Sequence, residues 1–326
     1  MWIGLRRTER SGMRLSKDRV DDAIKTLELG RVVDITPLSG GTSPVFRLDL
    51  SSDVSVVLKS YPDDGDKTPA REALAARQFL AVAVPVTRYL LIDETRNVLP
   101  FRFAITNCLP GVAGGSLKDH RDIASLYRQT GGLLRTLHAI AMPAYGAFGP
   151  DGIIDPVSTN AAFIRRIIED AFGRFAAFGA DTHVSARLRA IIEQHFQSVT
   201  SHSIGAVFAH DDLHPNNVLA VEDDRGNLVL SGLVDFGNAR AADAVFDLAK
   251  CLFCSEHDAP GSTPHILAGY GEIDHPSPAL AIWYYTILHR MVMWWWLRHV
   301  GVIPSATSPS DLMDRLIETG DSTAAP

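Results

Sequence analysis

Short apolar runs dominate the first third of the chain and alternate with turn-rich or polar segments. Runs of this length, rich in β-branched residues and bounded by turn residues, predict strands. The predicted strands cover residues 32–35, 45–50, 54–58, 84–91 and 102–106. Two helices accompany them, over residues 16–29 and around residues 69–80, where Pro69 lies near the first turn. This part of the chain is therefore predicted to be β-rich.

The pattern changes after residues 108–116, a segment with three glycines and one proline that is the best linker candidate. Beyond it, apolar residues recur mostly at helical spacing, interrupted by short β-like pieces. The predicted helices cover residues 123–137, 159–178, 184–198, 244–254, 263–270, 278–299 and 309–319, and the β-like pieces cover 207–210, 217–221 and 228–234. The sequence predicts an α+β fold with a small β-rich N-terminal lobe and a larger, mostly helical C-terminal lobe.

Composition limits the class of protein and its partners. Hydrophobic residues make up 46% and charged residues 21% of the 326 positions, which is ordinary for a globular chain. The net charge is −7, with +3 in residues 1–14 and −10 in the remainder, a sign that disfavours a nucleic-acid partner. No apolar run reaches the ~18 residues of a membrane helix, and the three cysteines favour a reducing cytoplasm. We expect a cytoplasmic monomer or weak dimer without a membrane or nucleic-acid partner.

The segment from His210 to Leu219 carries the clearest chemistry. Asp212 precedes Asn217 by five residues, and Asp235 follows Asn217 by eighteen, at a predicted strand end and directly before Phe-Gly. Two hard oxygen ligands from adjacent strand ends suit Mg²⁺, which takes few protein ligands and shares its coordination with phosphates. The remaining carboxylate, Asp212, can orient and deprotonate an attacking hydroxyl. These groups are the ones that phosphoryl transfer requires.

Phosphate-binding groups are expected upstream. Four residues between two predicted strands form a glycine-rich loop: Gly40, Gly41, Thr42 and Ser43. Glycines let backbone N–H groups approach a phosphate, although a hairpin turn uses the same residues. Lys59 ends the next strand, and Glu72 follows in the predicted helix. A strand lysine held by a glutamate of the next helix is how kinases grip nucleotide phosphates.

The glycine-rich loop, the lysine, the helix glutamate, the linker and the Asp and Asn motifs follow one another in one order along the chain. With these motifs the chain resembles the aminoglycoside phosphotransferase family, the small-molecule branch of the protein-kinase-like fold. The resemblance spans about residues 33–300. It rests on His210-x-Asp212-x-x-x-x-Asn217, Val234-Asp235-Phe236-Gly237, Asp243, Asp247-Leu248-Ala249, Leu109-Pro110-Gly111 and Leu137-His138. It implies a bilobal kinase-like enzyme that moves the γ-phosphoryl group of ATP or GTP to a hydroxyl of a small molecule.

The resemblance also implies roles for the matched residues. Asp212 is the catalytic base, Asn217 and Asp235 hold Mg²⁺, Asp247 braces the catalytic loop, and His210 orients that loop. The residues implied at the nucleotide are Gly40, Gly41, Thr42, Ser43, Lys59, Glu72, Asn107 and Leu109. Together with the composition of the two ends, this gives the expected parts of the chain: a flexible basic tail (1–16), a nucleotide-binding lobe (17–107), a hinge (108–116), a catalytic and acceptor-binding lobe (117–319) and a frayed tail (320–326).

Two positions depart from the family pattern. Asp211 stands where glycine is commonest and adds a charge beside the predicted base. Pro44 replaces a residue that is usually polar, so the glycine-rich loop is expected to be stiffer. Neither departure removes an essential group.

The stretch 251–289 contains no lysine or arginine but has four acids: Glu256, Asp258, Glu272 and Asp274. The resemblance places part of the acceptor side here, so these acids predict a wall for a cationic acceptor, although a solvated acidic surface explains the same charges. We expect an amine-bearing polyol, with an aminoglycoside first. Choline, ethanolamine, homoserine and other antibiotics are the alternatives.

Two other functions fit the sequence less well. A protein kinase is disfavoured because the motif lacks an arginine before Asp212 and a lysine two residues after it, and no Ala-Pro-Glu follows Asp-Phe-Gly. A catalytically inactive nucleotide-binding module is disfavoured because Asp212, Asn217, Asp235 and Lys59 are all present.

Overall fold

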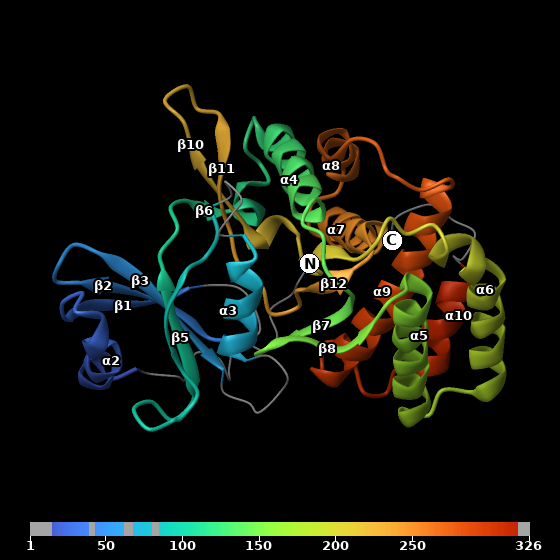
Figure 1. The fold of residues 1–326 in the computed structure, drawn as a ribbon, viewed down its shortest axis with the longest axis horizontal. Coiled ribbons are helices and arrows are strands. Elements are labelled where there is room, and N and C mark those ends of the chain that lie inside the picture. Colours follow the sequence, from blue (N-terminus) through green and yellow to red (C-terminus); the bar gives the residue numbers. More distant parts are fainter. Residues whose placement is uncertain (1–14, 39–42, 62–67, 80–84, 319–326) are drawn as a thin grey trace.

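The computed structural model describes residues 15–38, 43–61, 68–79 and 85–318. Figure 1 shows a β-rich N-terminal lobe and a larger, mostly helical C-terminal lobe. The helices and strands predicted from the sequence are present, with bounds that shift by up to five residues; residues 80, 84 and 319 of these predictions lie outside the described residues. The prediction of an α+β fold with two lobes is therefore confirmed.

The N-terminal lobe is built on a five-stranded antiparallel sheet with the order β1-β2-β3-β5-β4. Its strands are β1 (Val32–Leu38), β2 (Val45–Leu50), β3 (Ser55–Tyr61), β4 (Tyr89–Asp93) and β5 (Arg102–Asn107). Side chains alternate across a strand, so Val56 and Leu58 of β3 join a buried core with helix α2 (Lys17–Ile24), which a short 3₁₀ turn (Lys25–Leu27) follows. Lys59 faces the opposite side of the sheet.

Helix α3 (Pro69–Arg77) lies on that opposite side, between the two lobes (Figure 1). It begins after Thr68, whose side-chain oxygen accepts the Arg71 N–H at 3.1 Å. Just after the helix, the ring centroid of Phe79 lies 4.3 Å from that of Phe208 and 5.3 Å from that of Phe236, both in the C-terminal lobe. Aromatic packing therefore attaches α3 to the larger lobe.

Two small sheets belong to the second part of the chain. The first has the order β11-β10-β6, with β6 (Val112–Ala113), β10 (Val218–Glu222) and β11 (Leu228–Leu233). The second has the order β8-β7-β12-β9, with β7 (Tyr145–Gly149), β8 (Gly152–Val157), β9 (Val207–Ala209) and β12 (Arg240–Ala242). The predicted linker contains β6, which pairs with β10. The sequence did not predict β6 and β12, which have two and three residues, or β7 and β8, which contain glycines and, in β8, a proline.

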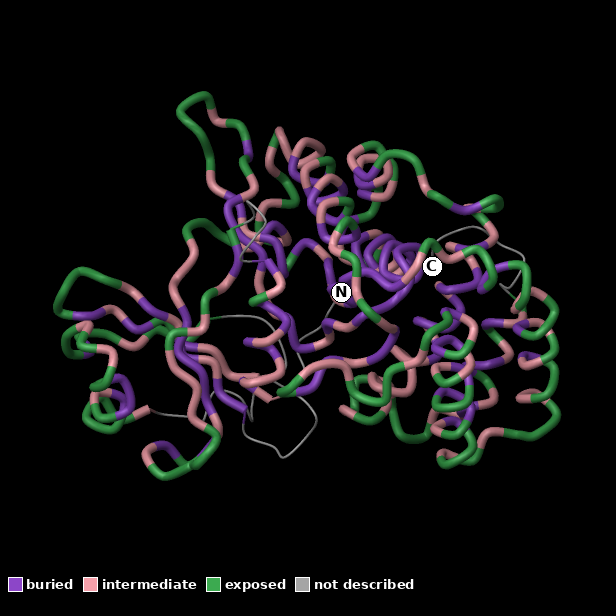
Figure 2. Tube along the Cα trace, viewed as in Figure 1, coloured by how far each residue is buried: buried purple, intermediate pink, exposed green. Residues whose placement is uncertain are grey.

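The helices of the C-terminal lobe surround one continuous core. They are α4 (Ile123–His138), α5 (Asn160–Ala177), α6 (Thr182–Thr200), α7 (Ala244–Asp258), α8 (Thr263–Tyr270), α9 (Pro278–His299) and α10 (Pro309–Glu318), with 3₁₀ turns at Gly114–Leu117 and Pro215–Asn217. Figure 2 shows that α7 is among the most deeply buried elements, which lets its side chains brace the loops beside it. A Cβ on Gly269 of α8 would lie 1.8 Å from the carbonyl oxygen of Arg128 in α4, so glycine permits the close packing of these two helices.

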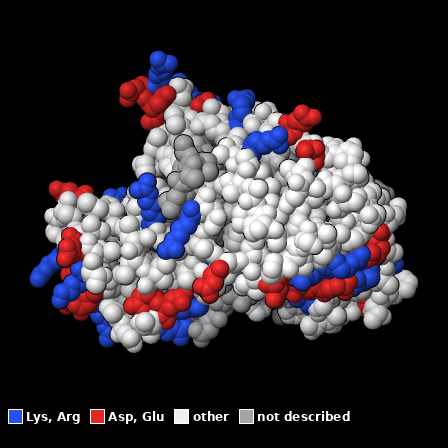
Figure 3. Space-filling view, viewed as in Figure 1, with Lys and Arg blue, Asp and Glu red and all other residues white. Residues whose placement is uncertain are grey.

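The surface carries both signs of charge. Figure 3 shows acidic and basic side chains interleaved over α5 and α6, where Arg189 pairs with Glu169 at 2.6 Å and Arg174 pairs with Asp170 at 2.7 Å. Within the described residues, no helix is both long enough and apolar enough to cross a membrane.

Candidate active site

Lys59 of β3 connects the two lobes. Its ammonium nitrogen lies 2.9 and 2.8 Å from the carboxylate oxygens of Glu72 in α3, and 3.0 Å from Oδ1 of Asp235, which follows β11. Tyr89 of β4 donates its hydroxyl hydrogen to Glu72 Oε2 at 2.8 Å. Residues from two strands, one helix and one loop therefore form one connected network around this ammonium group.

These contacts fix the charge of Lys59. Burial by itself lowers the pKa of a lysine because it disfavours the charged form. Here the carboxylates of Asp235 and Glu72 outweigh burial and hold the pKa of Lys59 well above its ordinary value. The Glu72 side chain is only 1% exposed, and a buried carboxylate needs such a partner. The site thus keeps a permanent cation that can bind an anion such as a phosphate.

Asp247, in the first turn of α7, holds the loop that carries Asp212. Its carboxylate accepts the backbone N–H groups of His210 and Asp211, each at 2.8 Å, and lies 3.1 Å from Nε2 of His138. Because Asp247 is fully buried, water does not compete for these bonds. The same loop is tied to β11 through His210, whose Nε2 lies 3.2 Å from the carbonyl oxygen of Val234.

Asn217 and Asp235 lie at the same end of the β10–β11 hairpin. Asn217 directly precedes β10, Asp235 follows β11 by two residues, and the antiparallel pairing sets Val218 opposite Leu233. Asp212 belongs to the same loop, because Asn217 Nδ2 donates to the Asp212 carbonyl oxygen at 2.8 Å. The structure therefore brings these three predicted residues to one end of the hairpin.

The oxygen atoms at this hairpin end fit Mg²⁺. The amide nitrogen of Asn217 is bonded to Asp212, which leaves its amide oxygen available as a ligand, and Asp235 adds a carboxylate. Mg²⁺ is usually bound through one or two protein carboxylates together with substrate phosphates. The described part of the chain holds no cluster of three or more His, Cys, Asp or Glu that could form an all-protein site. The two residues therefore suit a magnesium–nucleotide complex.

Three neighbours of the site were not identified from the sequence. Asn238 Nδ2 donates to Asp212 Oδ2 at 2.9 Å, and Lys250 Nζ lies 3.9 Å from Asp212 Oδ1. Tyr89, which bonds Glu72, is the third. Asn238 directly follows Asp-Phe-Gly and Lys250 directly follows Asp247-Leu-Ala, so both had a sequence signal. That signal does not tell where a side chain points.

The residues predicted at the nucleotide are described only in part. Three of them lie outside the described residues: Gly40, Gly41 and Thr42. Ser43 lies in a bend before β2. The backbone N–H of Asn107 donates to the carbonyl oxygen of Arg88 at 3.1 Å, so this donor already has a partner. The side chain of Leu109 packs against β11 at Gly232, where an added Cβ would lie 2.9 Å from Leu109 Cδ1.

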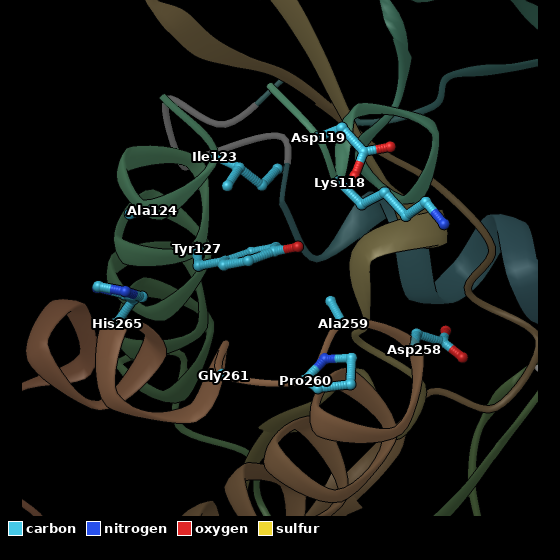
Figure 4. Close-up of a pocket in the computed structure, with 10 residues that line it drawn as sticks. All are labelled: Lys118, Asp119, Ile123, Ala124, Tyr127, Asp258, Ala259, Pro260, Gly261 and His265. Atoms are coloured by element: carbon cyan, nitrogen blue, oxygen red, sulfur yellow. The ribbon is translucent and has the colours of Figure 1, made fainter. Parts of the chain in front are cut away.

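A cavity of about 410 Å³ lies beside the loop that carries Asp212 and His214. Figure 4 shows Tyr127 of α4 reaching into it from one side, with Asp258 and Pro260 opposite and Lys118 and Asp119 at its edge. Its lining comes from the start of α4, the turn before it, and the connection from α7 to α8.

Asp258 links this cavity to the catalytic loop. Its Oδ2 lies 3.0 Å from Nδ1 of His214 and accepts a hydrogen from Nδ2 of Asn216 at 3.1 Å. Burial lowers the pKa of His214, but Asp258 and Asp212 outweigh burial, so the pKa of this imidazole is raised and its protonated form is favoured. Asp258 therefore contacts His214, which follows Asp212 by two residues in the chain.

The structure does not bring the four predicted acceptor acids together. Asp258 lines the cavity, whereas Glu256 accepts the backbone N–H groups of Gly261 at 2.7 Å and Thr263 at 3.1 Å and so orders the loop beside it. Glu272 and Asp274 are exposed, in the connection between α8 and α9, and are not among the described residues that line the cavity.

Comparison with known proteins places these features in a family. A protein-family model for the phosphotransferase enzyme family matches residues 34–281. A search among curated proteins gave no match. Among solved structures, aminoglycoside phosphotransferase APH(4)-Ia is similar with a TM-score of 0.67 and 20% identity, over 94% of this chain and 100% of that chain.

Two further structures are similar at comparable identity. A thermostable mutant of APH(4)-Ia in a ternary complex with AMP-PNP and hygromycin B has a TM-score of 0.66 and 20% identity, over 93% of this chain and 98% of that chain. Macrolide 2′-phosphotransferase MphH from Brachybacterium faecium has a TM-score of 0.61 and 16% identity, over 91% of this chain and 97% of that chain. At these identities the likeness establishes the fold.

The family model covers most of the chain, from β1 into α9, and therefore includes both lobes. The predictions of the kinase-like fold and of a phosphotransferase enzyme are confirmed. This chain belongs to the phosphotransferase enzyme family.

Proposed function

We propose that this chain transfers the γ-phosphoryl group of ATP or GTP to a hydroxyl of a small molecule, with Asp212 as the base. One observation carries the proposal: the Lys59 ammonium lies 3.0 Å from Asp235 Oδ1 and is held by both oxygens of Glu72. A cation for phosphates and a carboxylate for a metal thus meet beside the loop of Asp212 and Asn217. Positioning and charge neutralisation of this kind are the main work of phosphoryl transfer.

The donor nucleotide is proposed to bind between the lobes. Lys59 is proposed to bind its phosphates together with backbone groups of the glycine-rich segment 40–43. Asn107 ends β5 and Leu109 lies in the chain that leads to β6, and backbone groups near these two residues are proposed to contact the purine. Asn217 and Asp235 would hold Mg²⁺, which when bound neutralises phosphate charge.

In the proposed reaction, the acceptor hydroxyl passes its proton to the Asp212 carboxylate. The hydroxyl oxygen forms a new bond to the γ-phosphorus, the bond from that phosphorus to the β–γ bridging oxygen breaks, and the nucleoside diphosphate leaves. Asn238 Nδ2, at 2.9 Å from Asp212 Oδ2, holds one carboxylate oxygen during this step. An oriented carboxylate near the reacting hydroxyl is what general-base catalysis requires.

The acceptor is proposed to occupy the cavity beside the catalytic loop. Asp258 lines this cavity with its carboxylate bonded to His214 and Asn216, and the Tyr127 hydroxyl, which points into the space, supplies a further polar contact (Figure 4). Asp119 adds a second carboxylate and Lys118 an opposing charge at the edge. An acceptor that carries both amines and hydroxyls fits this lining, which supports an aminoglycoside as the leading class.

Replacing Asp258 with asparagine is expected to raise the acceptor KM by ~10–100-fold, the usual worth of a hydrogen bond to a charged group, with a smaller change in kcat. Asparagine keeps an acceptor for His214 and Asn216 but removes the charge that binds an amine. Steady-state kinetics at fixed nucleotide measure both constants.

The double variant Glu272→Gln/Asp274→Asn tests the two exposed acids, and Asp151→Asn, in the β7–β8 turn, controls for loss of one surface charge. We expect the largest rise in KM at Asp258. An unchanged KM for the Asp258 variant would contradict the proposal that the acceptor binds in this cavity.

A panel of acceptors tests the proposed substrate class. The panel comprises hygromycin B, a macrolide, choline, ethanolamine and homoserine, with glycerol as a neutral comparator and glycerate as an anionic one. With ATP or GTP as donor, we expect the highest turnover with an amine-bearing polyol. A best acceptor that is neutral or anionic would contradict the assignment of a cationic acceptor.

A further inference from the structure

Asp211 occupies a position that is unfavourable for its side chain. Its backbone φ is +52°, in the left-handed region that glycine adopts without strain. Its carboxylate is only 4% exposed, and burying a charge is costly unless the charge is paired. A glycine here would avoid both costs, so the carboxylate needs partners that offset them.

Two cations pair with Asp211. Arg240 of β12 places Nε 2.7 Å from Asp211 Oδ2, and Lys250 of α7 places Nζ 3.2 Å from Oδ1. Lys250 also donates to the backbone carbonyl oxygen of Asp211. Burial opposes the charged carboxylate, but Arg240 and Lys250 outweigh it and hold the pKa of Asp211 below its ordinary value.

Lys250 has a second carboxylate beside it. Its Nζ lies 3.9 Å from Oδ1 of Asp212, while Asn238 donates to Oδ2 of the same group. Burial lowers the pKa of Lys250, but Asp211 and then Asp212 outweigh burial and raise it. A charged ammonium on a largely buried stem therefore stands between the two neighbouring acids.

We propose that Lys250 is a positioning residue for phosphoryl transfer: Asp211 tethers its ammonium, which then fixes the orientation of the Asp212 carboxylate from the Oδ1 side. The inference rests on the proposed function, in which Asp212 is the base. Asn238 bonds one carboxylate oxygen and Lys250 attracts the other across 3.9 Å, so the two contacts together favour one orientation of the carboxylate. This role accounts for a buried carboxylate at the strained position 211, because Asp211 holds the Lys250 ammonium beside Asp212.

Arg240 provides a matched control. It pairs with the same Asp211 carboxylate, but its contacts among the described residues do not include Asp212. If the three charges only fasten the loop to β12 and α7, Lys250→Met and Arg240→Met should have similar effects. If Lys250 positions the base, the lysine variant should lose much more turnover for a similar loss of thermal stability.

The experiment measures phosphoryl transfer from Mg-ATP to the panel compound that the wild-type enzyme uses fastest. Lys250→Met should lower kcat ~10–100-fold, as loss of an orienting partner typically does, with the ATP KM little changed. Lys250→Arg should recover a large part of that loss, because it keeps the charge. In an Asp212→Asn background, Lys250→Met should cause no further loss, because the group that it positions is gone.

Each outcome decides a separate claim. An active Asp212→Asn enzyme would overturn the proposed function. A strongly impaired Asp212→Asn enzyme together with near wild-type kcat for Lys250→Met would overturn only the positioning role. Equal fold-losses from Lys250→Met in both backgrounds would overturn it as well. If Lys250→Met does not fold, Asp211→Asn loosens the tether and should lower kcat in the wild-type background only; unchanged kcat in that variant would also overturn the inference.

Discussion

Asp212→Asn is expected to lower turnover by ~10²–10⁴-fold, the usual contribution of a positioned general base, while nucleotide binding persists. An asparagine has nearly the same shape and still offers an oxygen to Asn238, but it cannot accept the proton of the attacking hydroxyl. The loss corresponds to about 3–5 kcal/mol of transition-state stabilisation. Single-turnover transfer at saturating Mg-ATP measures the step directly.

Two controls make this result specific. Asp224→Asn removes one carboxylate from the exposed β10–β11 turn and should leave transfer unchanged. Calorimetric titration with a nucleotide should give similar dissociation constants for the wild-type and Asp212→Asn proteins, because Lys59, Glu72 and Asp235 are intact. Near wild-type turnover of Asp212→Asn on its best acceptor would remove Asp212 from the role of base.

Asp235→Ala is expected to raise the Mg²⁺ concentration needed for half-maximal activity by at least ~10–100-fold, because losing only an outer partner of a metal ligand already costs that much. Asn217→Ala should have a smaller effect, since a neutral amide oxygen is a weaker ligand than a carboxylate for a hard dication. The measurement is a magnesium titration of transfer at fixed nucleotide.

The Lys59 contact complicates this variant, because Asp235 also bonds the ammonium at 3.0 Å. Nucleotide binding measured with and without Mg²⁺ separates the two effects. Wild-type protein should bind the magnesium complex more tightly than the free nucleotide, and Asp235→Ala should lose that difference. If both variants keep the wild-type magnesium requirement, the metal is bound elsewhere.

Local sequence patterns were sufficient for much of the fold. Helical spacing predicted residues 278–299, which is the range of α9, and apolar runs predicted the strand that ends near Lys59. Strands β6 and β12 were missed because their pairing partners are distant in sequence: Arg240 of β12 lies opposite Ala147 on one side and Ala209 on the other. Such pairing depends on the path of the chain in three dimensions, and the local spacing of apolar residues carries no information about it.

The candidate site shows the same division. Residue type and order were sufficient to predict the pair of Lys59 and Glu72. Lys59 lies on a strand, and Glu72, thirteen residues later, lies in the first turn of the next helix. Asn238 and Lys250 were missed, since their contacts with Asp212 depend on side-chain direction after the lobe has packed. The four acids of residues 251–289 were grouped by charge alone, whereas the path through α8 carries Glu272 away from the cavity that Asp258 lines.

The most direct test uses ATP labelled with ¹⁸O on the γ-phosphoryl group, incubated with purified protein, Mg²⁺ and the acceptor panel. Mass spectrometry then follows the label. We expect the labelled phosphoryl group on a hydroxyl of an amine-bearing acceptor with wild-type protein, and almost none with Asp212→Asn. Label found only in inorganic phosphate, or transfer that persists in Asp212→Asn, would contradict a phosphotransferase that uses Asp212 as its base.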